Sequence, residues 1–172
     1  MQLDIGEYQI RSWWPNDEDT IVKYANNRKV WINMRDVFPH PYMEKDARDW
    51  IRFATQQNPE THFAIASARE AIGGIGLYLQ EDVHRCSAEI GYWLGEPFWG
   101  KGIATRALCA LTEYAFAHFD LMRIYATVFE WNPASARVLE KAGYLYEGRL
   151  RKSVMKDGKA IDQLLYALVR ER

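Results

Sequence analysis

A short glycine turn joins an alternating segment to an amphipathic one, and this order restricts the fold more than any other feature of the chain. Residues 87–94 (SAEIGYWL) alternate between a face that carries Glu89 and a face that carries Tyr92, as in a β-strand. After Gly100-Lys101-Gly102, apolar residues recur at helical spacing over residues 103–118. We therefore predict a strand that leads through a glycine turn into a helix.

The remaining segments show the same two periodicities. Strand patterns cover residues 3–13, 62–67, 72–79, 123–129, 144–155 and 160–168, and helix patterns begin at residues 15–17, 43–46 and 132–133. Asp157-Gly158, between the last two strand patterns, is typical of a type I′ hairpin turn. We find no repeat or linker, so residues 1–172 form one predicted domain. The predicted class is α/β (α+β), with a central mixed, largely antiparallel sheet of about seven strands and about four flanking helices.

Bulk composition excludes several classes of protein. The chain has 172 residues with a formal net charge of -1, which argues against a nucleic-acid or anionic-membrane partner. Cys86 and Cys109 form neither a disulfide framework nor a zinc cluster, so we expect no metal and a reducing compartment. The first ten residues lack a signal-peptide pattern, and no apolar run reaches the roughly 20 residues of a membrane span. We therefore expect a cytoplasmic protein.

The glycine turn is a candidate anion site. Gly100 and Gly102 leave backbone N–H groups exposed at a helix N-terminus, where the helix dipole also favours negative charge, so a pyrophosphate would fit. Residues 95–102 nearly match a phosphate-binding Walker A loop, but Gly102 stands where Ser or Thr must hold Mg²⁺. Residues 100–105 begin like a dinucleotide fingerprint but end in Thr105, and no second strand with an acidic residue at its tip follows at the expected distance.

A third interpretation explains the turn better. The segment from Trp99 to Ala104 resembles the coenzyme A pyrophosphate loop of the GNAT acetyltransferases, although Trp99 replaces the usual Gln or Arg. A second block, from Asn132 to Tyr144, resembles the family's N-x-x-S/A helix that ends in K-x-G-F/Y. Further segments resemble the RimJ/RimL type of GNAT enzyme: Val30-Trp31, Met34-Arg35-Asp36, residues 38–42, Asp46-Ala47, Trp50-Ile51, residues 88–94 and Glu147-Gly148.

This resemblance covers essentially the whole chain and implies the GNAT fold, acetyl-CoA as cosubstrate and a primary amine as acceptor. That branch is associated with the acetylation of protein N-termini, and it includes enzymes that act on other amines. The resemblance also suggests a homodimer. It implies that acetyl-CoA contacts the chain at Tyr92, Trp93, Leu94, Trp99, Gly100, Lys101, Gly102, Ile103, Ala104, Thr105, Asn132 and Ser135.

Two residues are candidates for proton transfer within this resemblance. Glu89 lies on the central strand near the expected cleft, so it is our candidate general base; alternatively, it pairs with a neighbouring Arg or Lys. Many GNAT enzymes place a tyrosine on the later helix as general acid, but Leu139 occupies that position here. Ser135 is the candidate replacement, and its alternative role is to cap the helix or bind coenzyme A.

The acceptor would meet the loop of residues 33–42 and its surroundings. Trp31, Phe38, His40 and Tyr42 are the candidate acceptor-binding residues, with packing in the core as the alternative for the aromatic ones. A second function class also fits the departures at Trp99 and Leu139, namely an acyl-CoA-binding sensor without catalysis. Acetyl transfer to an amine would distinguish the enzyme from the sensor.

Overall fold

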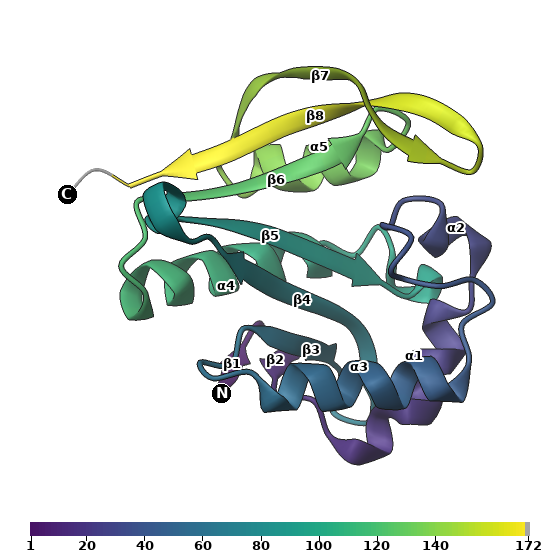
Figure 1. The fold of residues 1–172 in the computed structure, drawn as a ribbon. Coiled ribbons are helices and arrows are strands. Elements are labelled where there is room, and N and C mark those ends of the chain that lie inside the picture. Colours follow the sequence, from purple (N-terminus) through teal and green to yellow (C-terminus); the bar gives the residue numbers. More distant parts are fainter. Residues whose placement is uncertain (171–172) are drawn as a thin grey trace.

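The computed structural model describes residues 1–170, which form one eight-stranded sheet and five α-helices (Figure 1). The strands are β1 (Gln2–Asp4), β2 (Gln9–Arg11), β3 (His62–Ala66), β4 (Ala71–Leu79), β5 (Ser87–Leu94), β6 (Arg123–Phe129), β7 (Leu145–Lys156) and β8 (Lys159–Val169). The helices are α1 (Glu18–Ala25), α2 (Arg28–Trp31), α3 (Glu44–Gln56), α4 (Ile103–His118) and α5 (Pro133–Lys141). The predicted mixed, largely antiparallel sheet is confirmed.

The sheet has the order β1-β2-β3-β4-β5-β6-β8-β7, and β5–β6 is the one parallel pair among the described strands. This pair extends only from Ser87 to Glu89 on β5 and from Arg123 to Tyr125 on β6. Beyond these residues the two strands diverge, while β5 stays paired with β4 and β6 stays paired with β8 (Figure 1). The sheet is therefore open at its centre.

Two apolar clusters cover the two faces of the sheet. On one face, α4 and α5 bury residues such as Leu108, Leu111 and Leu139 against the strands. On the other face, α1 and α3 pack around Ile21, Trp13 and other residues of a smaller cluster. Alternate residues of β3 serve the two clusters, since Ile65 joins the first and Ala64 the second, as the two-residue period of a strand requires. The helices therefore support both halves of the open sheet.

The first strand pattern is an exception to the predicted elements. Residues 3–13 were expected as one strand, but they form the β1–β2 hairpin. Gly6 turns the chain with a φ of 88°, and its N–H donates to the Asp4 carboxylate at 3.0 Å. Apolar residues alternate on both sides of the turn, first at Leu3 and Ile5 and then at Tyr8 and Ile10, but the alternation changes phase between Ile5 and Tyr8, where the chain turns. The Asp157-Gly158 turn has the two positive φ angles (50° and 72°) that a type I′ turn requires.

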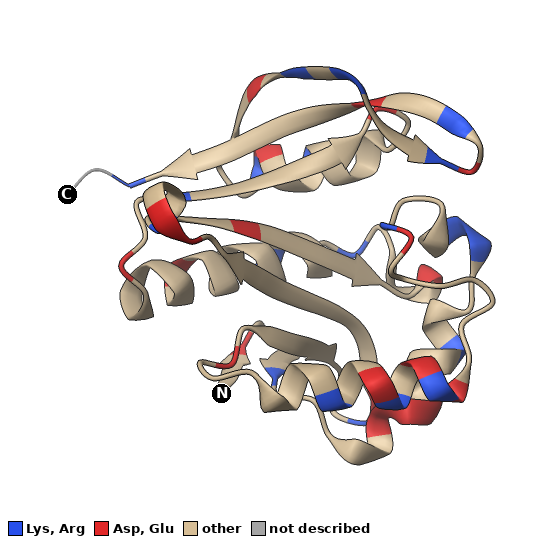
Figure 2. Ribbon diagram, viewed as in Figure 1, with Lys and Arg blue, Asp and Glu red and all other residues tan. Residues whose placement is uncertain are grey.

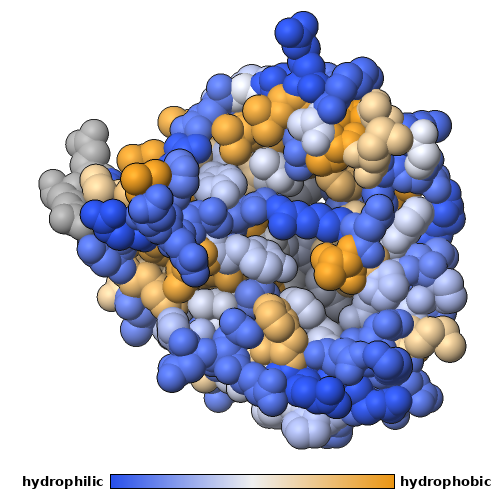
Figure 3. Space-filling model, viewed as in Figure 1, coloured by the Kyte–Doolittle hydropathy of each residue, from blue (hydrophilic) through white to orange (hydrophobic). Residues whose placement is uncertain are grey.

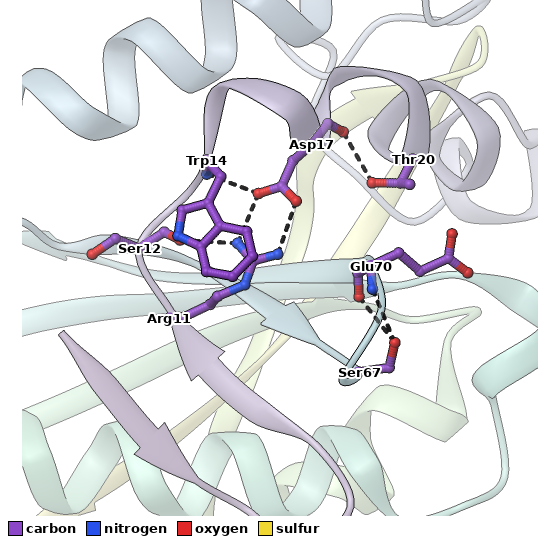
Figure 4. Close-up of polar contacts among 7 residues, drawn as sticks. All are labelled: Arg11, Ser12, Trp14, Asp17, Thr20, Ser67 and Glu70. Atoms are coloured by element: carbon purple, nitrogen blue, oxygen red, sulfur yellow. Dashed lines mark hydrogen bonds and ion pairs between the residues drawn. The ribbon is translucent and has the colours of Figure 1, made fainter.

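A buried ion pair joins β2 to the start of α1 (Figure 4). The Arg11 guanidinium donates two hydrogen bonds of 2.8 Å to the Asp17 carboxylate, and both side chains are about 95% buried (5% and 4% exposed). Asp17 also accepts from the Trp14 N–H, and the Trp14 ring covers Arg11 at 3.6 Å. The two charges therefore satisfy each other inside the protein, and each is costly to bury without the other.

His62 is a second buried polar residue that depends on its surroundings. The ring is 4% exposed and lies against the rings of Trp50, Phe53 and Tyr78. Its Nδ1 lies 3.0 Å from the Thr61 hydroxyl. Burial lowers the pKa of His62 to about 4, because the charged imidazolium would lose its water.

We expect this histidine to make stability depend on pH. The pKa of an unfolded histidine is about 6.5, so between about pH 6.5 and 4 the unfolded chain binds a proton that the folded chain does not. Stability therefore falls as the pH falls, by about 2 kcal/mol at pH 5. Urea unfolding at pH 7.5 and 5.0 should show a smaller loss for His62→Phe than for the wild type. His84→Ala, at an exposed position, should behave like the wild type; equal losses in all three proteins would contradict the assignment.

Candidate active site

The opening between β5 and β6 brings the two sequence blocks together. From Ile90 to Leu94, β5 pairs with β4 but no longer with β6, so its other edge faces the opening. The glycine turn follows the C-terminal end of β5, and α5 follows the C-terminal end of β6. Both predicted cofactor segments therefore flank one opening in the sheet.

The glycine turn has the geometry that its sequence predicts. Gly100 and Gly102 have φ angles of 75° and 71°, and Gly102 is the N-cap of α4. An added Cβ would meet nothing within 4 Å at Gly100 and only Arg106 at 3.7 Å at Gly102. The glycines are therefore required by the left-handed backbone rather than by crowding, and the space outside the turn is open. Residues 103–105 follow as the first turn of α4, with the Ile103 side chain buried.

Trp99 and Lys101 both contact residues that precede this turn. The Trp99 indole N–H donates to the Leu94 carbonyl at 2.7 Å, which ties the turn to the end of β5. The Leu94 carbonyl therefore already has a partner within the protein. The Lys101 ammonium lies 5.5 Å from the Phe98 ring. Trp99, where the family pattern has Gln or Arg, thus has a structural contact of its own.

Glu89 borders a cavity of about 490 Å³ on one face of the sheet. Figure 3, which has the same view as Figure 1, shows a hollow near the middle of the molecular surface. The cavity is lined by Arg35, Asp36, Glu89, Tyr125, Thr127, Phe129, Val154, Met155, Lys156 and Gln163. Strands β5 to β8 and the loop before α3 all contribute to it. It therefore combines residues that lie far apart in the sequence.

The Glu89 carboxylate is largely buried and has two partners. Its side chain is 15% exposed; it pairs with the Arg35 guanidinium and accepts from the Thr127 hydroxyl at 3.3 Å. Pairing with a neighbouring arginine is the alternative that the sequence left open for Glu89. Burial raises the pKa of the nearby Tyr125 and Tyr78 hydroxyls. Glu89 is the residue of β5 that lines the cavity, and its carboxylate is the acidic group that this strand provides there.

Ser135 meets Tyr92 on the opposite face of β5. The Ser135 Oγ lies 2.8 Å from the Tyr92 Oη, which also donates to the Ser135 carbonyl at 3.2 Å. Burial raises the pKa of Tyr92 to about 12, so its hydroxyl is protonated at neutral pH. Asn132 Oδ1 accepts from the Ser135 N–H at 3.2 Å and thereby caps α5. Leu139 is fully buried. Ser135 and Glu89 are thus on separate faces of the central strand.

None of the four predicted acceptor residues is part of the cavity lining. Trp31 and His40 are neighbours, with ring centroids 5.7 Å apart. Phe38 contacts Tyr42 and Trp93, whose ring centroids lie 4.9 and 5.6 Å from its own. Tyr42 is only 4% exposed and belongs to the smaller apolar cluster, as does Phe38 at its edge. Trp93 faces the same cluster, so only its backbone lies on the edge of the opening.

Sequence reasoning assigned no role to most of the cavity lining. Arg35 and Asp36 belong to a segment that carried the family resemblance, but nothing in the segment indicated which strand they would face. Thr127 and Tyr125 could have been found from their odd-numbered spacing on β6, which places them on one face. Lys156 and Gln163 come from the last hairpin, where only the three-dimensional register brings them to Glu89.

Residues 1–170, the part of the chain that the structure describes, offer neither a metal centre nor a helix that could span a membrane. These residues contain no cluster of three or more His, Cys, Asp or Glu side chains that could hold a metal ion. None of the described helices is both long and apolar enough to cross a membrane.

Comparison with known proteins agrees with this architecture. Residues 8–145 match the model of the acetyltransferase (GNAT) domain family. The chain is 30% identical to the ribosomal-protein-serine acetyltransferase of Escherichia coli, with 82% of this chain and 80% of that protein covered. It also resembles the structure of RimL, a ribosomal L7/L12 alpha-N-protein acetyltransferase in complex with coenzyme A (TM-score 0.86, 20% identity, 98% of each chain). The spermidine N-acetyltransferase of Vibrio cholerae has a TM-score of 0.79 at 24% identity over 95% of each chain.

The sheet, the glycine turn and these matches define the class of protein. The two structural similarities are below 25% identity and show the fold alone, whereas the family match covers most of the chain. The chain belongs to the GNAT family and to its RimJ/RimL-like branch. It is therefore an acetyl-CoA-dependent N-acetyltransferase.

Proposed function

We propose that this enzyme transfers the acetyl group of acetyl-CoA directly to a primary amine within a ternary complex. The observation that carries this proposal is the position of the opening between β5 and β6. The open glycine turn lies at the end of β5, and the Glu89 cavity borders the same strand. A thioester at the opening would therefore be held from the turn and approached by an amine from the cavity.

The glycine turn would hold the pyrophosphate of acetyl-CoA. Backbone N–H groups of Gly100, Gly102 and residues 103–105 lie at the N-terminus of the sixteen-residue helix α4. This end of a helix favours an anion, since it combines unpaired donors with the positive end of the dipole. The exposed edge of β5 from Tyr92 to Leu94 would meet the pantetheine arm, and Asn132 would contact the arm from the start of α5.

Proton transfer would be divided between the two faces of β5. An α-amine has a pKa of about 7.7–8.0, so a weak base is sufficient to deprotonate it. Glu89 would accept this proton, directly or through a water, while the amine nitrogen forms a bond to the thioester carbonyl carbon. As the carbon–sulfur bond breaks, the thiolate would take a proton from the Ser135–Tyr92 hydroxyl pair. The nitrogen would lose its second proton to water, and the hydroxyl pair would regain a proton from water.

Calorimetric titration with acetyl-CoA tests this proposal first, with ATP–Mg²⁺ and NAD as controls. We expect micromolar binding of acetyl-CoA alone, followed by acetyl transfer to at least one primary amine in a panel of peptides and small molecules. Acetyl-CoA binding without transfer to any amine would favour the sensor instead. Absence of acetyl-CoA binding would contradict the assignment of the glycine turn.

The turn itself can be tested by a matched pair of variants. Gly102→Val places a side chain where the pyrophosphate would approach, and we expect acetyl-CoA to bind about 10- to 100-fold more weakly. Gly158→Val is the control, because Gly158 has nearly the same φ (72° against 71°) and also has open space around it. Both variants carry similar backbone strain, so calorimetry should show a loss only for Gly102→Val. Equal affinities in the two folded variants would refute the placement.

The hydroxyl pair gives a separate prediction. Ser135→Ala removes one hydroxyl, whereas the Tyr92 hydroxyl keeps the Ser135 carbonyl as a hydrogen-bond partner. We expect kcat to fall about 10- to 100-fold, at or below the lower end of the roughly 10²- to 10⁴-fold that is usual for general acid catalysis, while the Kd of acetyl-CoA stays near the wild-type value. Tyr92→Phe should give a similar fall. Steady-state release of free coenzyme A measures both, and an unchanged kcat would mean that the thiolate leaves without this acid.

A further inference from the structure

The ion pair between Arg35 and Glu89 lies on the wall of the cavity rather than behind it. Both residues border the cavity, Arg35 from the loop before α3 and Glu89 from β5. The Arg35 side chain is 56% exposed, whereas that of Glu89 is 15% exposed. The Arg35 guanidinium also lies 5.7 Å from the Tyr78 ring. Arg35 is therefore held beside Glu89 from two directions while much of it faces outward.

Stability alone does not explain this arginine. An ion pair with one partner more than half exposed contributes about 0–1 kcal/mol, since water screens the charges. A guanidinium has five N–H donors in one plane, and Arg35 gives one contact to Glu89. The planar guanidinium can bind a carboxylate through two parallel hydrogen bonds, so arginine suits this ligand better than other side chains do. Arg35 can therefore keep its contact with Glu89 and still bind a second carboxylate.

We propose that the acceptor is a small amine that carries its own carboxylate, as an α-amino acid does, and that Arg35 binds this carboxylate. This inference rests on the proposed function and names the acceptor class of the same site. An α-amino acid places a positive ammonium and a negative carboxylate on one carbon atom. Arg35 and Glu89 are adjacent, and they present a positive charge to the carboxylate and a negative charge to the ammonium. Its ammonium therefore faces Glu89 when its carboxylate lies on Arg35.

The other charges on the cavity wall support a zwitterionic acceptor. The Lys156 ammonium donates to the Asp36 carboxylate at 2.8 Å and lies 3.7 Å above the Trp31 ring. The lining residues thus carry two positive and two negative side chains. Figure 2 shows further Lys and Arg positions on α2 and the β7–β8 hairpin. A polyamine, with two or more ammonium groups, would meet no excess of negative charge here.

The size and the apolar part of the cavity fit the same acceptor. A volume of about 490 Å³ lies in the range of small-molecule sites. Phe129, Val154 and Met155 provide an apolar wall for a side chain. A protein N-terminus has an amide carbonyl where a free amino acid has its carboxylate, so it would offer Arg35 no second carboxylate. The proposal therefore separates free amino acids from protein N-termini.

Matched acceptors test this inference directly. For phenylalanine, methionine and threonine, acetyl transfer is measured with the acid, its amide and the corresponding decarboxylated amine, with spermidine as a polycation. At saturating acetyl-CoA, we expect kcat/KM for the best acid to exceed that for its amide and its amine by at least 10-fold. Arg35→Gln should reduce this acid-to-amine ratio to about 1, mainly through a higher KM for the acid.

Arg28→Gln is the matched control. Arg28 also belongs to an exposed ion pair near this region, at 2.6 Å from Asp157, but it does not border the cavity. It should keep the wild-type acid-to-amine ratio. An amide, an amine or spermidine that reacts as well as the acids would overturn the proposal. An Arg35→Gln variant whose kcat/KM falls by the same factor for acid and amine would also overturn it, because Arg35 would then only support Glu89.

A binding measurement keeps this inference separate from the proposed function. If acetyl-CoA binds but no amine is acetylated, the proposed function fails, and the coenzyme A complex is then titrated with the same acids and amines. An acid that binds more tightly than its decarboxylated amine would still support the carboxylate site, provided that Arg35→Gln abolishes this binding. Equal binding of acid and amine, or binding of neither, would overturn it.

Discussion

Replacement of Glu89 by glutamine is expected to lower kcat by about 10²- to 10⁴-fold, the range typical of a lost general base. Glutamine has the same shape and can still accept the hydrogen bond from Thr127, so the cavity should keep its form. It cannot take the proton of the ammonium. The pH dependence of steady-state acetylation should therefore also differ from that of the wild type. Calorimetry should give a nearly unchanged Kd for acetyl-CoA.

A second glutamate provides the control for this experiment. Glu147 forms an exposed ion pair with Arg123, at 2.8 Å, and does not border the cavity. Glu147→Gln makes the same chemical change and should leave kcat and its pH dependence as they are. Wild-type turnover and an unchanged pH profile in Glu89→Gln would remove Glu89 from the mechanism and leave it as the partner of Arg35.

Replacement of Asp17 by alanine is expected to lower the free energy of unfolding by about 3–5 kcal/mol. The change leaves the Arg11 guanidinium buried without its counter-ion and removes the acceptor of the Trp14 N–H. Few single changes have so large an effect, since most cost about 0.5–3 kcal/mol. Urea unfolding at neutral pH measures the difference.

An exposed pair again calibrates the result. Glu147→Ala breaks a pair whose side chains are 29% and 36% exposed, and it should cost less than about 1 kcal/mol. Equal losses in Asp17→Ala and Glu147→Ala would mean that water reaches the Arg11 pocket and that the burial of the pair is not important for stability. A loss confined to Asp17→Ala would confirm that the β2–α1 connection depends on this pair.

Regular elements were predicted well where one periodicity dominates. The strand of residues 87–94 and the helix of residues 103–118 have the predicted bounds, because each buries one face and exposes the other. The first hairpin was missed, because two short alternating runs were interpreted as one strand although the alternation changes phase at Gly6-Glu7. The four-residue helix α2 was also missed, because a segment of that length shows no full helical period.

Of the candidate site, only the segments expected to hold coenzyme A could be predicted from the sequence. The glycine turn and the Asn132–Ser135 segment are local, so their residues and backbone geometry could be identified from the chain alone. The cavity is built from β5, β6, the last hairpin and the loop at Arg35, and its lining depends on strand order and register. Arg35 and Lys156 are 121 positions apart in the sequence, and no local pattern links them.

The divergence of β5 from β6 has a consequence for how such an enzyme can change over time. The turn that would hold acetyl-CoA belongs to the β5–α4 connection, whereas most of the cavity lining belongs to the loop before α3 and to β6–β8. Substitutions in the second group can therefore accumulate without disturbing the first. The same fold can therefore keep one acyl donor while its acceptor changes, because separate parts of the chain would bind the donor and the acceptor.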